Sequence, residues 1–147
     1  TQLTFAQLRD RVAQLAGQLD QLAPGDKVGL LTTNRLAGYL AALAIICSGR
    51  TVVWLNWRLA NEELSRQVAD SQLHCCLVAD DLWRPEMGAD FIRLQKLAEI
   101  TAAPAALVPV FDSDRIASIM YTSGTTGKPK AFCRPLATTS IRRFPQR

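Results

Sequence analysis

The sequence lacks several features that would place it in common functional classes. No apolar run approaches the roughly 20 residues that a membrane-spanning helix needs, the longest being Leu40 to Cys47. The four cysteines show no spacing typical of a metal site, and there is one histidine, His74. Nothing at Thr1 resembles a signal peptide, and there is no initiator methionine. We expect a cytoplasmic protein with no membrane partner and no metal site, whose sequence begins inside a longer protein.

What the sequence does contain is typical of a globular domain. It has 147 residues, of which 48% are hydrophobic and 20% charged, enough for one core. The net charge of +4 is uneven, because no acidic residue follows Asp114. A basic tail could bind nucleic acid. We favour a solvated or non-native tail, and therefore expect no nucleic-acid partner. Cys75 and Cys76 are expected to be buried on opposite faces of a strand.

Apolar periodicity predicts alternating helices and strands. The predicted elements are, in chain order, a helix at Thr4–Leu22 capped by Thr4, a strand at Lys27–Leu31, a helix at about Arg35–Cys47 capped by Thr33-Asn34, a strand at Thr51–Leu55, a helix at about Asn61–Ser71 capped by Asn61, a strand at His74–Ala79, a short helix at Leu94–Ile100, a linker at Ala102–Pro109 and a strand at Ile116–Tyr121. This order predicts an α/β fold, with a parallel sheet flanked by helices on both faces.

The last predicted strand leads into a loop rich in glycine, hydroxyls and lysine, from Thr122 to Lys130. Gly124 and Gly127 permit positive φ and a close approach of backbone N–H groups to an anion. The loop is not a Walker A motif, because only Thr125 and Thr126 separate its glycines. From composition alone, a surface turn with two solvated lysines is an equally good interpretation.

The order of these residues is more specific than their composition. Tyr121 to Lys130 (Tyr-Thr-Ser-Gly-Thr-Thr-Gly-Lys-Pro-Lys) resembles, without a mismatch, the phosphate-loop signature of the adenylate-forming superfamily, which includes acyl-CoA synthetases and peptide-synthetase adenylation domains. Leu3 to Leu8 resembles the opening of that superfamily, and Ala41 to Gly49, followed by Val53 to Leu59, resembles a further block of it. The resemblance therefore extends over roughly Leu3 to Lys130.

The resemblance implies part of the large N-terminal domain of an ATP-dependent acid–thiol ligase. It implies ATP with Mg²⁺ as cofactors, CoA as a co-substrate, and small-molecule partners only: ATP, a carboxylic acid and CoA. The cofactor-binding residues that it implies are Thr122, Ser123, Gly124, Thr125, Thr126, Gly127, Lys128 and Lys130. The later motifs of the family are absent, so we expect no catalytic residue, no metal ligand, and little or no activity from this chain alone.

The tail resembles no sequence of the family. We therefore divide the chain into a partial AMP-binding domain at 1–131 and a non-family tail at 132–147. Codons can be chosen for Phe132 to Thr139 that, reread after one inserted base, encode a sequence resembling o-succinylbenzoate–CoA ligases, the menaquinone-pathway branch of the superfamily. We hypothesise a frameshift after Ala131. Because the strand that normally follows the loop would then be replaced, we expect an open sheet edge.

For the other candidate residues, the case for a functional role is weaker than for the loop. His74 is expected to be structural on a buried strand, and Trp54, Trp57 and Trp83 are expected to pack in the core or an interface. Asn56 and Arg58 lie where α/β sites often form, but a structural role is favoured. Two alternatives to the o-succinylbenzoate branch stay open: a fragment of another acyl-CoA synthetase or adenylation domain, and a stand-alone, non-catalytic nucleotide-binding module.

Overall fold

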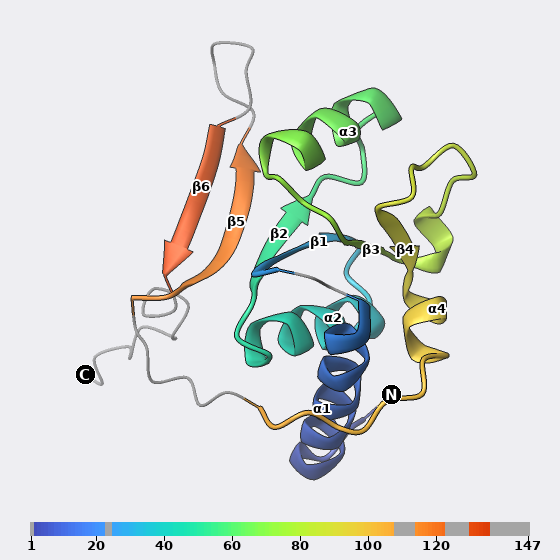
Figure 1. Ribbon diagram of the computed structural model, residues 1–147, viewed down its shortest axis with the longest axis vertical. Helices are drawn as coiled ribbons and strands as arrows, with labels where there is room; N and C mark the ends of the chain where they lie inside the picture. The colour runs from blue at the N-terminus through green and yellow to red at the C-terminus, as the bar shows by residue number, and fades with distance from the viewer. Residues whose placement is uncertain (1, 23–24, 108–113, 123–129, 136–147) are drawn as a thin grey trace.

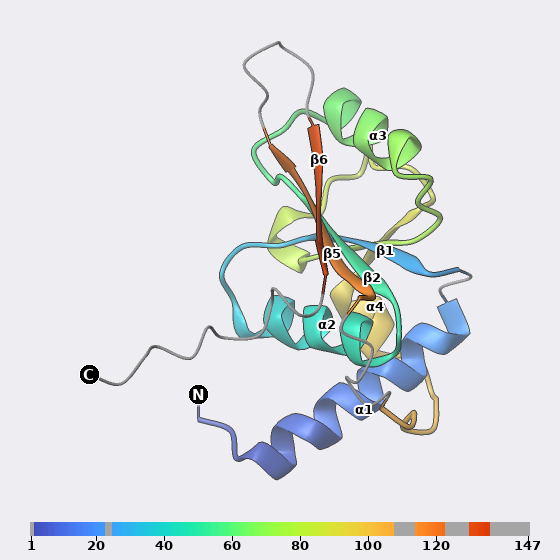
Figure 2. The ribbon, with the colours of Figure 1, turned by 90° about the vertical axis from the view of Figure 1, so that its left-hand side faces the viewer.

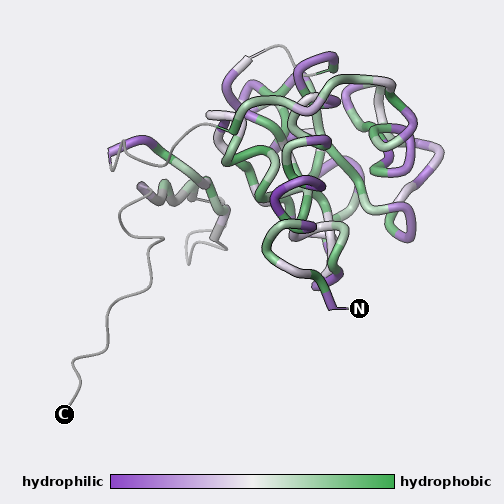
Figure 3. The backbone as a smooth tube through the Cα atoms, turned by 90° about the horizontal axis from the view of Figure 1, so that it is seen from below, coloured by the Kyte–Doolittle hydropathy of each residue, from purple (hydrophilic) through white to green (hydrophobic). Residues whose placement is uncertain are grey.

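A computed structural model describes residues 2–22, 25–107, 114–122 and 130–135. These residues form a layered α/β structure around one sheet, with helices below it and above it in the view of Figure 1. The strand order in the sheet is β4-β3-β1-β2-β5-β6. In Figure 3, hydrophobic segments concentrate inside the main body and hydrophilic segments lie around its rim.

The sheet is parallel over five of its strands. These are β1 (Lys27–Leu31), β2 (Thr51–Leu55), β3 (Cys76–Val78), β4 (Phe91–Arg93) and β5 (Ile116–Thr122). The sixth strand, β6 (Lys130–Pro135), pairs antiparallel with β5 at one edge. The parallel α/β fold predicted from the element order is confirmed.

Helices cover both faces of the sheet, and each face has its own apolar core. Helices α1 (Phe5–Leu22), α2 (Leu36–Cys47) and α4 (Leu94–Ala98) pack on one face, against Val28, Leu30 and Val52. Helix α3 (Asn61–Asp70) packs on the other, against Leu31, Val53 and Leu55. Successive strand residues alternate between the cores because strand side chains point to opposite faces in turn. Cys75 and Cys76 divide in the same way, as predicted.

The N-terminal cap of α1 follows the sequence prediction. The Gln7 backbone N–H donates to Thr4 Oγ1 (3.2 Å), and the Thr4 N–H donates to Gln7 Oε1 (2.9 Å). This reciprocal pair satisfies backbone donors that the first helical turn leaves without partners.

Two other predicted caps are wrong. The N-cap of α2 is Arg35 rather than Thr33-Asn34, and the N-cap of α3 is Ala60 rather than Asn61. At α3 the Glu63 carboxylate accepts from the Ala60 N–H (3.1 Å), so a residue inside the helix satisfies the free donor. Asn61 Oδ1 instead accepts from Arg84 Nη1 (2.8 Å).

Three predictions near β3 and the sheet edges are corrected. His74 is exposed and precedes β3, which is shorter than predicted, so it does not lie on a buried strand. The short strand β4 was not predicted. We expected β5 to be left without a partner strand after the loop, and this is wrong, because residues 130–135 form β6 and pair with β5. The outer strand on this side of the sheet is β6.

The predicted linker after α4 lies along α1 rather than apart from it. The Ala105 N–H donates to the Ala13 carbonyl (2.9 Å), and Gln14 Nε2 donates to the Ala102 carbonyl (2.9 Å). Gly17 permits this approach, since an added Cβ would lie 2.0 Å from the Ala103 carbonyl oxygen. The described part of the linker, 102–107, therefore belongs to the packed structure; residues 108–109 lie outside the description.

Candidate functional site

The parallel strands β1, β2, β3 and β5 all end at one edge of the sheet, which we call the carboxyl edge. Residues that follow parallel strands gather at such an edge, where open α/β sheets bind ligands. The glycine-hydroxyl-lysine segment leaves the sheet here, because Thr122 is the last residue of β5. The topology thus places the start of this segment, Thr122, at the edge that α/β proteins use for binding.

The two strands around the segment hold its ends side by side. β5 and β6 are neighbouring strands (Figures 1 and 2). In their antiparallel register, Thr122 lies opposite Lys130. Of the predicted binding residues, the structure brings these two together. The others, Ser123, Gly124, Thr125, Thr126, Gly127 and Lys128, lie outside the described residues.

The strand that leads into the segment is fixed from two sides. Its backbone pairs with β2 on one side and β6 on the other. Tyr121, next to Thr122, contacts Ser71 Oγ at the end of α3 through its phenolic hydroxyl. The Ser71 carbonyl in turn accepts from Lys27 Nζ (2.6 Å) at the start of β1. The start of the segment is therefore linked to both α3 and the centre of the sheet.

A small cavity of about 100 Å³ lies at the same edge on the α2 side, lined by Thr32, Thr33, Asn34, Gly38, Tyr39 and Trp54. It has room for a few waters rather than a nucleotide. Within the described part of the chain, Thr33 Oγ1 is a buried atom without a hydrogen-bond partner. A buried polar atom therefore lies at this edge of the sheet, just after the end of β1.

The loop after β2 is organised by contacts within the chain. The Asn56 side-chain oxygen accepts from the Arg58 N–H (3.0 Å), and the Arg58 guanidinium lies 5.1 Å from the centre of the Trp57 ring. Arg84, which sequence analysis did not single out, donates to the carbonyls of Trp57 (3.3 Å) and Leu59 (3.2 Å). These contacts agree with the structural role expected for Asn56 and Arg58.

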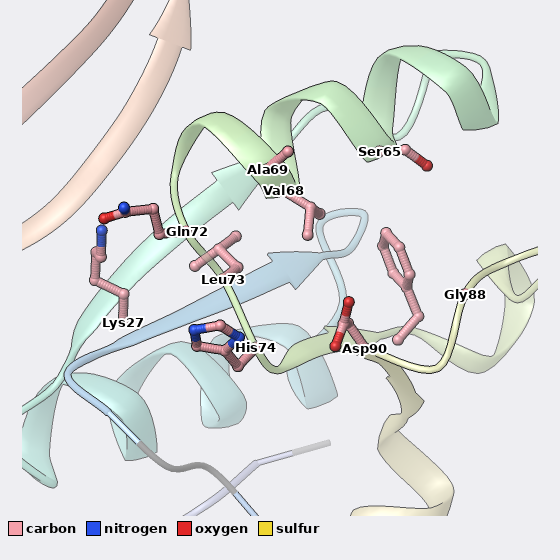
Figure 4. Close-up of a pocket in the computed structure, with 10 residues that line it drawn as sticks. Lys27, Ser65, Val68, Ala69, Gln72, Leu73, His74, Gly88 and Asp90 are labelled. Atoms are coloured by element: carbon pink, nitrogen blue, oxygen red, sulfur yellow. The ribbon is translucent and has the colours of Figure 1, made fainter.

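A larger cavity of about 710 Å³ lies at the opposite, amino edge of the sheet (Figure 4). Leu73 and Phe91 are among the apolar residues that line it, while Lys27, His74 and Asp90 contribute charged or polar groups. These residues lie at or before the first residues of β1, β3 and β4. Thr122, from which the glycine-hydroxyl-lysine segment starts, is at the other, carboxyl edge of the sheet.

Buried thiols provide no nucleophile. Burial is the largest cause that raises the pKa of Cys75 to about 11 and that of Cys76 to about 12, from an ordinary 9.0. Burial also raises the pKa of Cys47. All four cysteines, the exposed Cys133 included, are free thiols. Thiols with such high pKa values stay protonated near neutral pH, and the thiolate is the reactive form.

Two features are absent from the described residues. No cluster of three or more His, Cys, Asp or Glu side chains there could hold a metal ion. Within the same ranges, no helix combines the length and apolar character that crossing a bilayer requires.

Comparison with known proteins gives a matching family and similar proteins of known name. Residues 1–135 match the AMP-binding enzyme family. The 2-succinylbenzoate–CoA ligase of Listeria monocytogenes serotype 4b (strain F2365) is 39% identical over 129 residues, which are 86% of this chain and 27% of that protein. The chain thus spans little more than a quarter of the length of that relative.

Solved structures with the same fold also match this chain over less than half of their own length. The o-succinylbenzoate CoA synthetase of Bacillus subtilis in complex with the acyl-adenylate intermediate OSB-AMP is 25% identical with a TM-score of 0.77, and the match covers 97% of this chain and 42% of that one. A double mutant of the same enzyme, bound to the product analogue OSB-NCoA, is 25% identical with a TM-score of 0.81, covering 97% and 33%.

Proposed function

The chain belongs to the AMP-binding enzyme family, and from this premise we propose that it is an N-terminal portion of an ATP-dependent acyl-CoA ligase, specifically an o-succinylbenzoate–CoA ligase. The observation that carries the proposal is the position of the Tyr121–Lys130 signature. Its second residue, Thr122, and its last residue, Lys130, lie opposite each other at the carboxyl edge of a parallel sheet. That edge is where phosphate-bearing ligands meet α/β sheets.

We assign the binding of ATP phosphates to eight residues. Hydroxyls of Thr122, Ser123, Thr125 and Thr126 and backbone N–H groups at Gly124 and Gly127 would donate hydrogen bonds, and Lys128 and Lys130 would supply positive charge. The segment contains no carboxylate, so its donor set suits phosphate oxygens and does not suit a metal ion. Mg²⁺ would therefore enter with ATP rather than on ligands of this chain.

The reaction that this family membership supports has two steps. A carboxylate oxygen of the acid attacks the α-phosphorus of ATP, and pyrophosphate leaves with the electron pair of the broken P–O bond. The thiol sulfur of CoA then attacks the acyl carbon, and AMP leaves as the thiol gives up its proton. The part proposed for this chain is to hold the phosphates and so orient the α-phosphorus.

We propose that the chain alone has little or no ligase activity. Transition-state charge at the α-phosphorus needs preorganised partners, and the segment supplies groups for phosphate binding only. The proposed substrates are o-succinylbenzoate and CoA, supported by the named relatives. Four free thiols agree with a reducing compartment, and we propose the cytoplasm.

The proposed boundary between domain and tail stays at residue 131, with out-of-frame translation after it. β6 and the family match both continue to Pro135, a few residues further. Backbone pairing explains the strand in either case, since ladder hydrogen bonds use main-chain groups. Sequencing the encoding DNA tests the boundary. Ligase sequence in another frame directly downstream supports it, and an intact frame without such sequence contradicts it.

Pyrophosphate exchange tests the ligase assignment. The purified chain should give no ATP–pyrophosphate exchange with o-succinylbenzoate, whereas residues 1–131 fused to the rest of the Listeria relative should restore it. Exchange by the fusion with a different acid would favour another acyl-CoA synthetase. Exchange by the chain alone would show that the later family motifs are not needed.

One observation favours a second function, that of a stand-alone nucleotide-binding module. The described residues contain two apolar cores of their own, one on each face of the sheet. A chain with such cores can present a phosphate-binding segment without further domains. This function predicts nucleotide binding by the chain together with a fusion that stays inactive.

A further inference from the structure

The cavity at the amino edge of the sheet has the size and lining of a small-molecule site. Its volume of about 710 Å³ is within the range of ligand pockets, about 300–1,000 Å³. It lies on the face of the sheet that α3 covers, since Ser65, Val68 and Ala69 of that helix line it. The ATP contacts proposed above start from Thr122 at the opposite edge, so they do not account for this cavity.

The lining combines a buried apolar part with a polar rim. Leu73 and Phe91 are buried. Lys27 is half-buried, and His74 and Asp90 are exposed. A few placed polar groups around an apolar interior are typical of sites for small molecules. A ligand with an apolar body and polar ends matches this division.

The rim carries opposite charges at its two ends. In the sheet, β3 lies between β1 and β4, so the strand starts near Lys27 and Asp90 are about 10 Å apart. Figure 4 shows His74 and Leu73 between Lys27 on one side and Asp90 on the other. Among the ion pairs within the described ranges, none involves Lys27 or Asp90. One cationic end and one anionic end are therefore present.

Both charged residues are held in place by contacts of their own. The Asp90 carbonyl accepts from the Cys76 N–H (2.7 Å), which fixes the backbone at one end of the cavity. At the other end, Lys27 Nζ donates to the Ser71 carbonyl (2.6 Å). That bond uses one of the three donors of the ammonium group and leaves two for an anion. Groups fixed before binding reduce the entropy that a ligand must lose.

Gln72 adds an amide at the Lys27 end. Its φ is 53°, and within the described chain it is the one non-glycine residue with a positive φ. Glycine or asparagine usually takes this conformation at the end of a helix. The Gln72 side chain points toward the Lys27 ammonium group (Figure 4). The turn after α3 would suit glycine, yet residue 72 carries an amide that can donate to a ligand.

We propose that this cavity is a binding site for a small zwitterion whose carboxylate and ammonium groups are separated by an apolar body. The carboxylate would accept hydrogen bonds from Lys27 and Gln72, and the ammonium group would pair with Asp90. The apolar body would cover Leu73 and Phe91. A simple anion would leave Asp90 unpaired, and a simple cation would leave Lys27 unpaired, so a zwitterion complements the site best. The proposal goes beyond the ligase function and does not depend on it.

NMR titration with 4-(aminomethyl)benzoate tests the site, because an aromatic ring separates the two charges of this probe. His74 is the single histidine of the 147-residue chain, so its ring protons report on the cavity without overlap. The probe should shift these signals to saturation in the millimolar range. The analogues 4-methylbenzoate and 4-methylbenzylamine each lack one charge and should bind about fivefold more weakly.

Three variants connect this binding to named residues. Asp90→Asn should weaken the zwitterion about fivefold and leave the affinity for 4-methylbenzoate unchanged. Gln72→Gly suits the positive φ and so keeps the fold, and it should weaken both carboxylates. Glu99→Gln, an exposed position at the end of α4 on the other face of the sheet, should bind like the unchanged chain.

The outcomes decide the proposal in either direction. Saturation that needs both charges, weakened by Asp90→Asn for the zwitterion alone, supports it. His74 signals that do not saturate, equal affinities for the three probes, or an Asp90→Asn variant with unchanged affinity for the zwitterion would overturn it. Displacement of the probe by MgATP would also overturn it, because the probe would then lie at the carboxyl edge. The titration itself uses no nucleotide, so pyrophosphate exchange detects a failure of the proposed ligase function separately.

Discussion

The Tyr121 hydroxyl contacts Ser71 Oγ, which joins the end of α3 to the strand that leads into the phosphate-loop signature. Ser71 is buried, and its carbonyl also accepts a hydrogen bond from Lys27 Nζ at the start of β1. One residue at the end of α3 therefore connects β1 and β5, which are separated in the sheet by β2. Tyr121 is therefore held in place directly before Thr122, the last residue of β5.

Tyr121→Phe should reduce both stability and nucleotide binding. Removing the phenolic hydroxyl leaves Ser71 Oγ buried with one partner fewer, at a cost of about 1–2 kcal/mol in the free energy of unfolding. If β5 then shifts, MgATP should bind up to about tenfold more weakly. Chemical denaturation and calorimetric titration measure the two effects.

Tyr39→Phe is the matched control for this substitution. Tyr39 is 54% exposed and its hydroxyl has a long, exposed contact with Asn34 Oδ1 (3.5 Å). Stability and MgATP affinity should both stay close to those of the unchanged protein. Equal effects of the two substitutions would contradict the role given to the Ser71 contact.

Gly17→Ala should destabilise the chain even though alanine favours helices. Alanine in place of glycine normally gains about 1 kcal/mol inside a helix. Here the new Cβ would meet the Ala103 carbonyl at 2.0 Å, and that atom belongs to backbone packed on α1. Overpacking of this kind costs about 1–3 kcal/mol, so we expect a net loss.

Gly88→Ala provides the comparison, because an added Cβ there meets nothing within 4 Å. Its free energy of unfolding should change by no more than about 0.5 kcal/mol. If Gly17→Ala were as stable as Gly88→Ala, segment 102–107 would not pack on α1 as described.

The buried thiols should make stability fall at alkaline pH. The pKa of Cys75 is about 11 and that of Cys76 about 12 in the folded chain, against 9.0 for an ordinary thiol. Above pH 9 the unfolded chain therefore loses thiol protons that the folded chain keeps, which favours unfolding. The contribution of the two buried thiols to the free energy of unfolding is fully present below pH 9, and it decreases as the pH rises toward 11–12.

Denaturant unfolding between pH 8 and 11 tests this linkage. A Cys75→Ala/Cys76→Ala variant should show a shallower loss of stability over that range than the unchanged chain. Cys133→Ala, which removes an exposed thiol, should keep the original slope. Identical slopes for all three proteins would mean that the buried thiols ionise as readily as exposed ones.

The parts of the fold that sequence predicted well are those with long or repeated apolar patterns. The bounds of β1 and β2 agree with the prediction, as does the range of α1 to within one residue. β4 was missed because Phe91–Arg93 is too short to show an alternating pattern, and its strand character depends on pairing with β3. His74 was misplaced for a related reason, since β3 begins later than its apolar pattern suggests.

Local chemistry was predicted less well where two residues could satisfy the same backbone group. Asn61 is a good N-cap by type, yet Glu63 satisfies the donor at Ala60 and leaves Asn61 to bind Arg84. The role of Arg84 depends on three segments meeting in space, which no spacing in the sequence encodes. For the candidate site, sequence predicted Thr122 and Lys130 as its ends, and the register of β5 and β6 places them opposite each other.

Binding of MgATP to the signature is the central claim, and thermal unfolding of the purified chain with and without MgATP tests it most directly. At a 100-fold excess over its dissociation constant, the nucleotide should stabilise the folded chain by about 2.7 kcal/mol and raise the melting temperature by roughly 5–10 °C. Lys128→Ala should lose most of this rise, and Lys96→Ala, an exposed lysine on α4, should keep it. A well-folded chain whose melting temperature does not change with MgATP, or changes equally in both lysine variants, would contradict the account.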